Sequence, residues 1–226
     1  MSIGRTVGKS LAPRIQNLAP EMTNNFVREA LNRAILGVGP LPAAAVSARK
    51  QLQDEHGNVD EAIKGVIQLH VQYAGAQGFL TNLGGLVTAV VAVPANITGL
   101  ALIQCRMIAG IAELRGYDLD DPRVRNAILT CLLGKDDVER LVRKKKLPAP
   151  PMALATAPAY DPDIERLITA EVASELITRV AGKRLATTIG RRVPIVGGLV
   201  GLTADAVATW QVGRYADKEL LPRARR

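Results

Sequence analysis

The stretch 65-GVIQLHVQYAGAQGFLTNLGGLVTAVVAVPANITGLALIQC-105 contains no Asp, Glu, Lys or Arg. Pro94 separates two apolar runs of about 18 residues each, Ala76–Val93 and Ala95–Ala112. As helices these runs would each be about 27 Å long, at ~1.5 Å per residue. A helix of ~20 apolar residues can span a bilayer, whereas one of ~10–14 usually lies in a protein core. The length of each run therefore lies on the border between deep core and membrane span.

Glycine and alanine recur through this stretch and through a second apolar zone, Val193 to Ala204. Both zones contain Gly-Gly-Leu-Val, and spacings such as Gly197–Gly201 and Ala95–Gly99 put small residues on one helix face. Such faces allow very close helix packing, in membranes as well as in tightly packed soluble cores. We predict a helical hairpin over Phe79–Ala112, packed against a helix over Val193–Val212.

Composition favours an all-α protein. Of 226 residues, 48% are hydrophobic and only 3% aromatic, so Ala, Leu, Val and Ile supply most of the apolar mass. Alanine-rich cores are usually helical, and no stretch alternates cleanly between apolar and polar residues as strands do. The predicted fold is a compact helical bundle with a central apolar, glycine-rich hairpin packed against an apolar C-terminal helix.

Proline and charge patterns divide the chain. Residues 1–20 contain Pro13 and Pro20 and are expected to form an irregular N-terminal arm. Residues 21–222 are expected to form one helical domain, interrupted at 147–163 by a linker with five prolines. Asn58 with Glu61 three residues later predicts a capping box, and Pro122 after Asp121 predicts another helix start.

The net charge of +8 points to an anionic partner. Polybasic segments beside apolar runs are attracted to anionic lipid by ~1 kcal/mol per charge. Nucleic acid is disfavoured because single-strand binders stack bases on aromatic residues, which are scarce here. A basic face that is merely solvated is the simpler alternative. The residues predicted to contact anionic lipid are Lys144, Lys145, Lys146, Arg191 and Arg192.

Two further sets of residues are candidate site residues. An isolated charge in apolar surroundings is costly unless it is paired. Arg106 and Asp205 are therefore predicted to pair with each other or each with a nearby helix cap. The predicted apolar contacts with a membrane are Phe79, Leu80, Leu83, Leu86, Val90, Val91, Leu100, Ile103, Val196 and Leu199.

No pattern of catalytic or metal-binding residues stands out. Gly4 to Ser10 resembles a phosphate-binding loop but has three residues, not four, between its glycines. His70 lies in an apolar helical context typical of a core histidine, and Cys105 and Cys131 have no metal or redox spacing. We expect no enzyme activity, no cofactor and no metal, with the thiols reduced. The N-terminus lacks the apolar core of a secretory signal, so a cytoplasmic protein is expected.

Several segments resemble the EcsC protein family. They are Ala76–Gly85, the run from Pro94 to Asp118, Arg192–Gly198 and Gly213–Ala216. The resemblance covers about residues 58 to 220, and the N-terminal arm and the proline-rich linker look peculiar to this chain. It implies a helical, bacterial protein at or near a membrane, with a largely uncharacterised activity and no catalytic residues to carry over.

Two functions remain open. In the first, the chain is a non-enzymatic helical protein at the inner face of the cell membrane, attached peripherally or through an inserted hairpin. In the second, it is a soluble helical module that binds a protein, a second copy of itself, a lipid or another hydrophobic ligand. The sequence does not distinguish an apolar core from an apolar surface.

Overall fold

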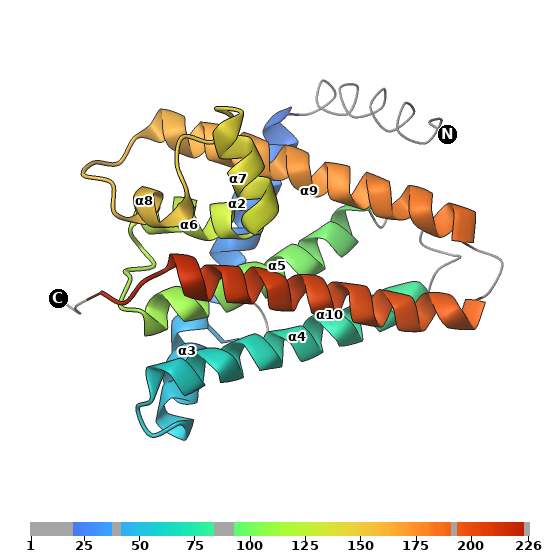
Figure 1. Ribbon diagram of the computed structural model, residues 1–226, viewed down its shortest axis with the longest axis horizontal. Coiled ribbons are helices and arrows are strands. Elements are labelled where there is room, and N and C mark those ends of the chain that lie inside the picture. The colour runs from blue at the N-terminus through green and yellow to red at the C-terminus, as the bar shows by residue number, and fades with distance from the viewer. Residues whose placement is uncertain (1–19, 38–41, 84–92, 191–193, 224–226) are drawn as a thin grey trace.

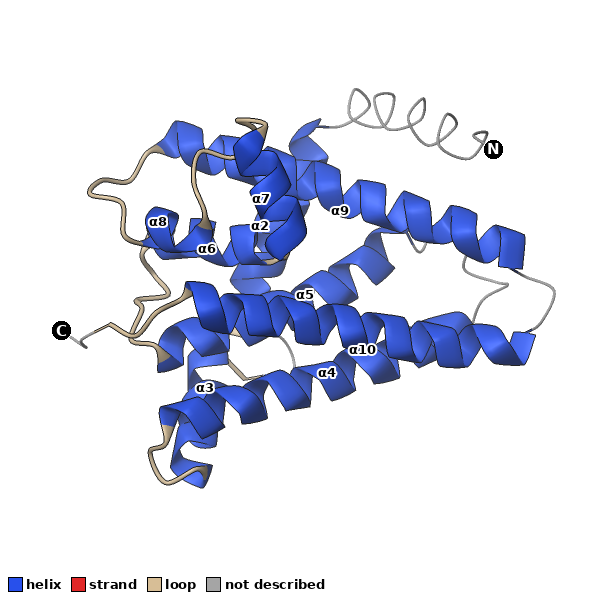
Figure 2. Ribbon diagram, viewed as in Figure 1, coloured by secondary structure: helices blue, strands red, loops and turns tan. Residues whose placement is uncertain are grey.

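The computed structural model is a bundle of helices (Figures 1 and 2). The structure describes residues 20–37, 42–83, 93–190 and 194–223, with side chains for 27–37, 42–76, 99–178 and 204–223. Within these residues every regular element is an α-helix, as predicted. The helices are α2 (Pro20–Leu36), α3 (Ala44–Asp54), α4 (Val59–Leu83), α5 (Val93–Leu114), α6 (Pro122–Cys131), α7 (Lys135–Arg143), α8 (Pro151–Ala155), α9 (Pro162–Gly190) and α10 (Pro194–Glu219).

Helix α5 is the centre of the core. It contacts α2, α3, α4, α6 and α10, and Met107, Ile108 and Ile111 are completely buried. A helix that is apolar on all sides is stable only when other elements surround it. The described part of the second half of the predicted hairpin is therefore packed against protein.

Helices α4 and α10 lie side by side and antiparallel, and α10 packs more extensively on α4 than on any other helix (Figure 1). A Cβ atom added at Gly213 would lie 3.0 Å from both Ile67 Cγ1 and Met107 Sδ. Because real Cβ atoms do not usually come so close to a neighbour, only glycine lets α10 approach both α4 and α5 here. Helices α4 and α10, each of which includes part of a glycine-rich zone, thus pack together, and the details of the predicted hairpin stay a prediction.

The predicted helix starts are present. Asn58 Oδ1 accepts a hydrogen bond of 3.2 Å from the Glu61 backbone N–H at the start of α4. Asp121 accepts from the Arg123 backbone N–H at 2.8 Å, and Pro122 occupies the first position of α6. After the C-terminal end of α5, Gly116 has a φ of +84°, the left-handed conformation that commonly ends a helix.

The segment 147–163 lies between α7 and the start of α9, and it is not a free linker. It contains helix α8, which packs on α6. Leu147, Pro151, Leu154 and Ala155 are buried. The prolines rigidify a segment that also contributes apolar side chains to the core, so proline content alone misrepresents its role. The arm at 1–20 lies almost wholly outside the described residues.

Candidate functional site

Four helix ends lie at one end of the molecule, on the right in Figure 1. They are the C-terminal ends of α4 and α9 and the N-terminal ends of α5 and α10. Residues 65–105, which include this end of α4 and α5, carry no charge, and neither do residues 193–204 at the start of α10. We call these parts of the three helices the uncharged end of α4, α5 and α10. The sequence 176–192, which leads to α10, carries five basic residues and no acidic one.

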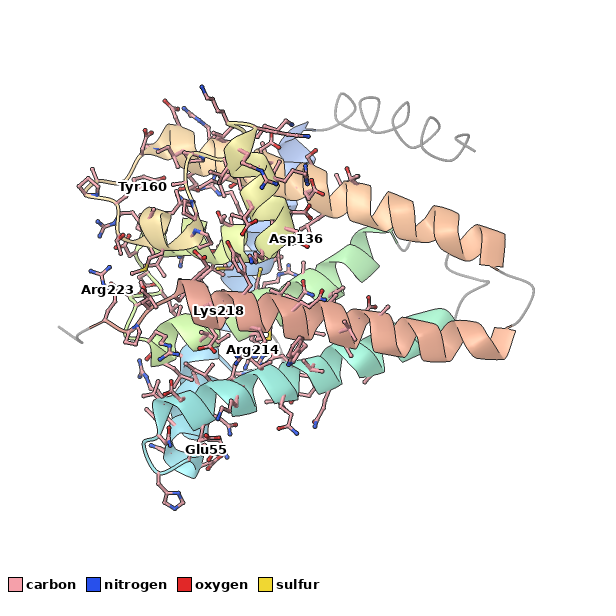
Figure 3. The ribbon with its side chains drawn as sticks, viewed as in Figure 1. Glu55, Asp136, Tyr160, Arg214, Lys218 and Arg223 are labelled. Carbon is pink, nitrogen blue, oxygen red and sulfur yellow. The ribbon has the colours of Figure 1, made fainter. Side chains whose placement is uncertain are left out.

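Exposed positions on α4 and α10 become less polar toward this end. On α4 the exposed side chains change from Glu61 and Lys64, through Gln68 and Gln72, to Ala76. On α10 the outward positions change from Lys218 and Arg214, through Gln211 and Trp210, to Val207 and Ala204. Figure 3 shows Arg214 and Lys218 on the part of α10 that leads away from the uncharged end. Both helices thus present a gradient from charge to apolar surface in one direction.

Three large apolar or aromatic side chains are exposed within this gradient. Trp210 and Val207 on α10 are each 53% exposed, and Tyr73 on α4 is 43% exposed. Since Val207 and Trp210 are three residues apart, they are neighbours on one face of the helix. Sequence reasoning missed these residues, although Trp210 is the chain's only tryptophan and lies just beyond the uncharged stretch.

Buried polar contacts lie close in the sequence to these exposed side chains, on the same helices and on α5. Gln104 Nε2 on α5 donates a hydrogen bond of 3.1 Å to Thr209 Oγ1 on α10, and both side chains are buried. His70 on α4 is buried, with Nδ1 2.8 Å from the Val66 carbonyl oxygen and no partner for Nε2. Burial lowers the pKa of His70 to about 4, and the nearby positive charge of Arg106 acts in the same direction.

Arg106 does not pair with Asp205 among the contacts between described side chains. Its guanidinium donates to the Pro42 carbonyl oxygen and, at 2.6 Å, to Ser47 Oγ. These partners lie at the start of α3, whereas Asp205 is on α10. The two residues share their isolation in the sequence, and the described contacts of Arg106 are with Pro42 and Ser47 rather than with Asp205. The alternative, that Arg106 is satisfied near a helix start, fits these contacts.

The predicted apolar contact residues are only partly described. Leu100 and Ile103 are half-buried on α5. Phe79, Leu80 and Leu83 belong to α4, and Val196 and Leu199 to α10, but their side chains lie outside the described set. Leu86, Val90 and Val91 lie outside the described residues altogether. The contact of these residues with a membrane stays a prediction.

Three of the predicted lipid-binding cations lie in described residues. Lys144, Lys145 and Lys146 are exposed and follow α7, in the half of the molecule that holds α6 and α8 (Figure 1). Lys146 Nζ is also 3.5 Å from Glu171 Oε2. Arg191 and Arg192 lie outside the described residues, in the sequence between the end of α9 and the start of α10. The contact of these five residues with anionic lipid stays a prediction.

One hollow, of about 360 Å³, is lined by Leu52, Val59, Leu114 and Pro222 together with the charged Asp60, Arg115 and Arg223. Another, of about 370 Å³, is lined by side chains from α2, α6 and α9 and from the loops before α6 and α9, among them Arg28, Arg125, Tyr160 and Glu165. Glu165 Oε1 is already 2.5 Å from Arg28 Nη2, so these charges neutralise each other. Among residues with described positions, no group of three or more His, Cys, Asp or Glu is placed to hold a metal ion.

The membrane-span hypothesis finds no support in the helices that are described. No helix in those parts of the chain combines the length and the apolar character needed to cross a bilayer.

Comparison with known proteins identifies a family. No curated protein and no solved structure matches this chain. The model of the EcsC protein family matches residues 2–224. The match includes the N-terminal arm and the proline-rich segment, which corrects the view that these parts are peculiar to this chain. Since it spans nearly all 226 residues, the chain belongs to the EcsC protein family.

Proposed function

We propose that this chain is a non-enzymatic protein that binds the surface of an anionic membrane through the uncharged end of α4, α5 and α10. In a bacterial cell this surface is the inner face of the cell membrane, and its lipids are the first partner. The observation that carries the proposal is the gradient along α4 and α10, from charged through polar to apolar exposed positions. Water favours the charged part of each helix, and lipid favours the apolar part.

The charge around this end supports an anionic lipid partner. Residues 176–204 carry Arg179, Lys183, Arg184, Arg191 and Arg192, with no Asp or Glu. Each Lys or Arg near an anionic leaflet contributes ~1 kcal/mol of attraction, within the Debye length of ~8–10 Å. Apolar contact and basic charge together provide the two signals that stable peripheral attachment requires.

A soluble interaction module is the second candidate function. The exposed pair Val207 and Trp210 is the observation that favours it, because aromatic residues are enriched where proteins bind one another. A cavity for a hydrophobic ligand has less support, since the hollow beside Arg28 and Glu165 is lined by paired charges.

Flotation with liposomes separates these functions. The purified protein is mixed with vesicles of phosphatidylcholine alone or with phosphatidylglycerol, at low and at high salt, and centrifuged through a density gradient. We expect flotation with the anionic vesicles and weaker flotation with the neutral ones. High salt should reduce flotation without abolishing it, because salt screens charge but not apolar contact. A protein that remains at the bottom with anionic vesicles at low salt contradicts the membrane proposal.

Two charge-reversal variants locate the contact. Arg191 and Arg192 are replaced by Glu in one variant, and Lys144 and Lys145 in the other, so that both change the net charge equally. We expect the first variant to lose most flotation and the second to keep it, since only the first pair immediately precedes α10 in the sequence. Equal loss in both variants would mean that net charge alone drives binding, with Lys144–Lys146 contributing as much as Arg191 and Arg192.

A further inference from the structure

We propose that the hollow between α2, α6 and the start of α9 binds a neutral polyhydroxylated molecule of sugar size, through Asn32, Arg125 and Asn126. This site goes beyond the proposed function and does not depend on it. We call it the amide hollow, after Asn32 and Asn126, which both line it. Tyr160 also lines it, and Figure 3 shows Tyr160 at the end of the molecule opposite the uncharged end.

The amide hollow is lined by a buried amide that has no partner. Asn126 on α6 is 4% exposed, and its side-chain amide makes no hydrogen bond among the contacts of described residues. In the same part of the chain, the side-chain atoms that are sealed from solvent without a partner are His70 Nε2 and Arg115 Nε. The Asn126 amide is therefore reached from the hollow. Because an amide without a hydrogen bond is costly to bury, a ligand that satisfies it gains affinity.

Arg125 and Asn32 extend this hydrogen-bonding surface. Arg125 Nε donates to the Leu119 carbonyl oxygen at 3.0 Å, and Nη1 donates to Asn32 Oδ1 at 3.2 Å. These two bonds hold the guanidinium in place. The carboxylate of Asp120 is 88% exposed and lies 3.6 Å from Arg125 Nη2, which is too far for a hydrogen bond. The remaining N–H groups of Arg125 and of the Asn32 amide are thus donors for a ligand.

The balance of charge in the amide hollow selects an uncharged ligand. Its charged lining residues are Arg28, Arg125, Asp120 and Glu165. Glu165 already contacts Arg28 at 2.5 Å and accepts from the Tyr160 hydroxyl. A ligand with a net charge would meet as many like charges as opposite ones. Hydroxyl groups both donate and accept, so they match the amides, the guanidinium and the carboxylates together.

The size and the apolar lining of the amide hollow suit a small ring. Its volume of about 370 Å³ is at the lower end of the ~300–1,000 Å³ range of small-molecule sites. Leu31, Pro122 and Leu129 contribute apolar lining, and Tyr160 is 42% exposed. A sugar ring can place its C–H groups against these residues and its hydroxyls against the polar ones. This combination of apolar walls and a few placed polar groups is typical of ligand sites.

Saturation-transfer difference NMR with the full chain tests the inference. The neutral probes are methyl glucoside, methyl galactoside and N-acetylglucosamine, and the charged probes of similar size are glucuronate and glucosamine. We expect saturation transfer to at least one neutral sugar at millimolar concentration, and weaker transfer to both charged sugars. Absence of transfer to all three neutral sugars overturns the inference. Stronger binding of a charged sugar contradicts the assignment of a neutral ligand.

Asn126→Leu separates a ligand-binding role of this residue from a structural one. The substitution removes the amide and keeps a side chain of similar size. We expect it to weaken binding of the neutral sugar about tenfold and to leave thermal melting unchanged or slightly higher, because no hydrogen bond within the protein is lost. A melting temperature well below that of the parent would mean that the amide has a partner within the protein, which contradicts the site.

Two arginines provide the matched control. Arg125 lines the amide hollow, whereas Arg166 is 73% exposed, pairs with Asp163 and does not line it. Replacement of either by Gln removes one positive charge. Arg125→Gln is expected to weaken sugar binding about tenfold, and Arg166→Gln less than about twofold. Equal effects of the two variants would place the bound sugar elsewhere on the chain and contradict the site.

The source of the sugar is tested separately, because a sugar is either free in solution or the headgroup of a lipid. The position of the amide hollow, away from the uncharged end, favours a free sugar (Figure 3). Flotation is compared between phosphatidylcholine vesicles with and without glucosyl diacylglycerol. Equal flotation supports a free sugar as the ligand. Flotation that requires the glycolipid and is lost in Asn126→Leu contradicts it.

Discussion

At one end of the α4–α5–α10 core, residues far apart in the sequence are joined by ion pairs and hydrogen bonds, whereas at the other end the same helices carry no charge for several turns. At the charged end, Arg115 at the end of α5 contacts Asp60 at 3.1 Å and Asp217 at 2.7 Å. The Arg115 carbonyl oxygen also accepts from the Arg223 backbone N–H at 2.8 Å. Figure 3 shows Arg223 near this end, where its guanidinium lies 5.6 Å from the Tyr117 ring centroid.

This difference marks two regions along the same helices. Contacts at the charged end join α4, α5, α10 and the C-terminal segment. At the uncharged end, the described α10 side chains Val207 and Trp210 are exposed although both are apolar or aromatic. The comparison predicts that substitutions have different consequences according to their level in the bundle.

The largest expected effect tests the buried part of α5. Ile108 is completely buried, whereas Ile103, more than one turn closer to the uncharged end, is half-buried. Ile108→Ala is expected to lower the free energy of unfolding by about 4 kcal/mol, since it leaves a cavity in a surrounded helix. Ile103→Ala is expected to lower it by about 1 kcal/mol, in proportion to the smaller area buried. Urea unfolding measures both, and equal losses would contradict the division of α5 into core and end.

The next effect concerns His70, which lies where the two regions meet. Its pKa is about 4 in the folded protein, against an ordinary value of 6.5, because burial disfavours the charged imidazole. The unfolded chain therefore binds a proton at higher pH than the folded one, and stability falls as the pH drops from about 6.5 to about 4. The loss amounts to about 3 kcal/mol over this window, at 1.36 kcal/mol per pKa unit.

A variant isolates the contribution of His70. Carboxylates also titrate near the lower limit, so unfolding is compared between the parent protein and His70→Gln from about pH 7 to about pH 4. The variant should lose less stability on acidification than the parent. His56→Gln, which changes an exposed residue, should behave as the parent does. Parallel curves for the parent and His70→Gln would mean that folding does not lower the pKa of His70.

The charged end is tested by Arg115, whose side chain is only 14% exposed. Arg115→Ala removes the contact with Asp217, itself 16% exposed, and is expected to cost about 2 kcal/mol of unfolding free energy. The loss is below that of a fully buried pair because Arg214 still contacts Asp217 at 3.3 Å.

A surface arginine is the matched control for Arg115. Arg166 pairs with Asp163 on α9, and both side chains are more than 70% exposed. Arg166→Ala is expected to change stability by less than about 1 kcal/mol, because water competes with an exposed ion pair. If the two variants melt alike, Arg115 does not join the helices at the charged end, and the contrast between the two ends loses its energetic basis.

Local signals made much of the fold predictable. The caps at Asn58 and Asp121 depend on residues adjacent in the sequence, and the predicted helix starts are present. The absence of charge over 65–105 identified the helices at the centre of the bundle, but it could not separate core from surface. Met107 and Leu100 are both apolar residues of α5. Met107 is buried and Leu100 is half-buried, a difference that depends on how the neighbouring helices pack on α5.

Long-range contacts were the part that sequence reasoning could not reach. The Pro42 carbonyl oxygen that accepts from Arg106 is a backbone atom in a loop, and no side-chain pattern indicates it. The exposure of Trp210 likewise depends on which face of α10 packs against α4. Its position beyond an uncharged stretch was a usable signal, but an amphipathic face cannot be assigned to core or surface before its packing partner is known.

The smallest expected effect concerns Gly213, where α10 packs closely against both α4 and α5. Gly213→Ala places a Cβ atom 3.0 Å from Ile67 and Met107. The strain of overpacking exceeds the gain in helix propensity, and we expect a loss of about 1 kcal/mol in unfolding free energy. Gly110→Ala on α5 places its Cβ 3.4 Å from Val66 Cγ1, an ordinary contact, so the same gain in propensity should leave stability unchanged or slightly higher. Guanidinium unfolding of both variants gives the answer, because equal stabilities would mean that α10 can move away from Ile67 and Met107 at no cost.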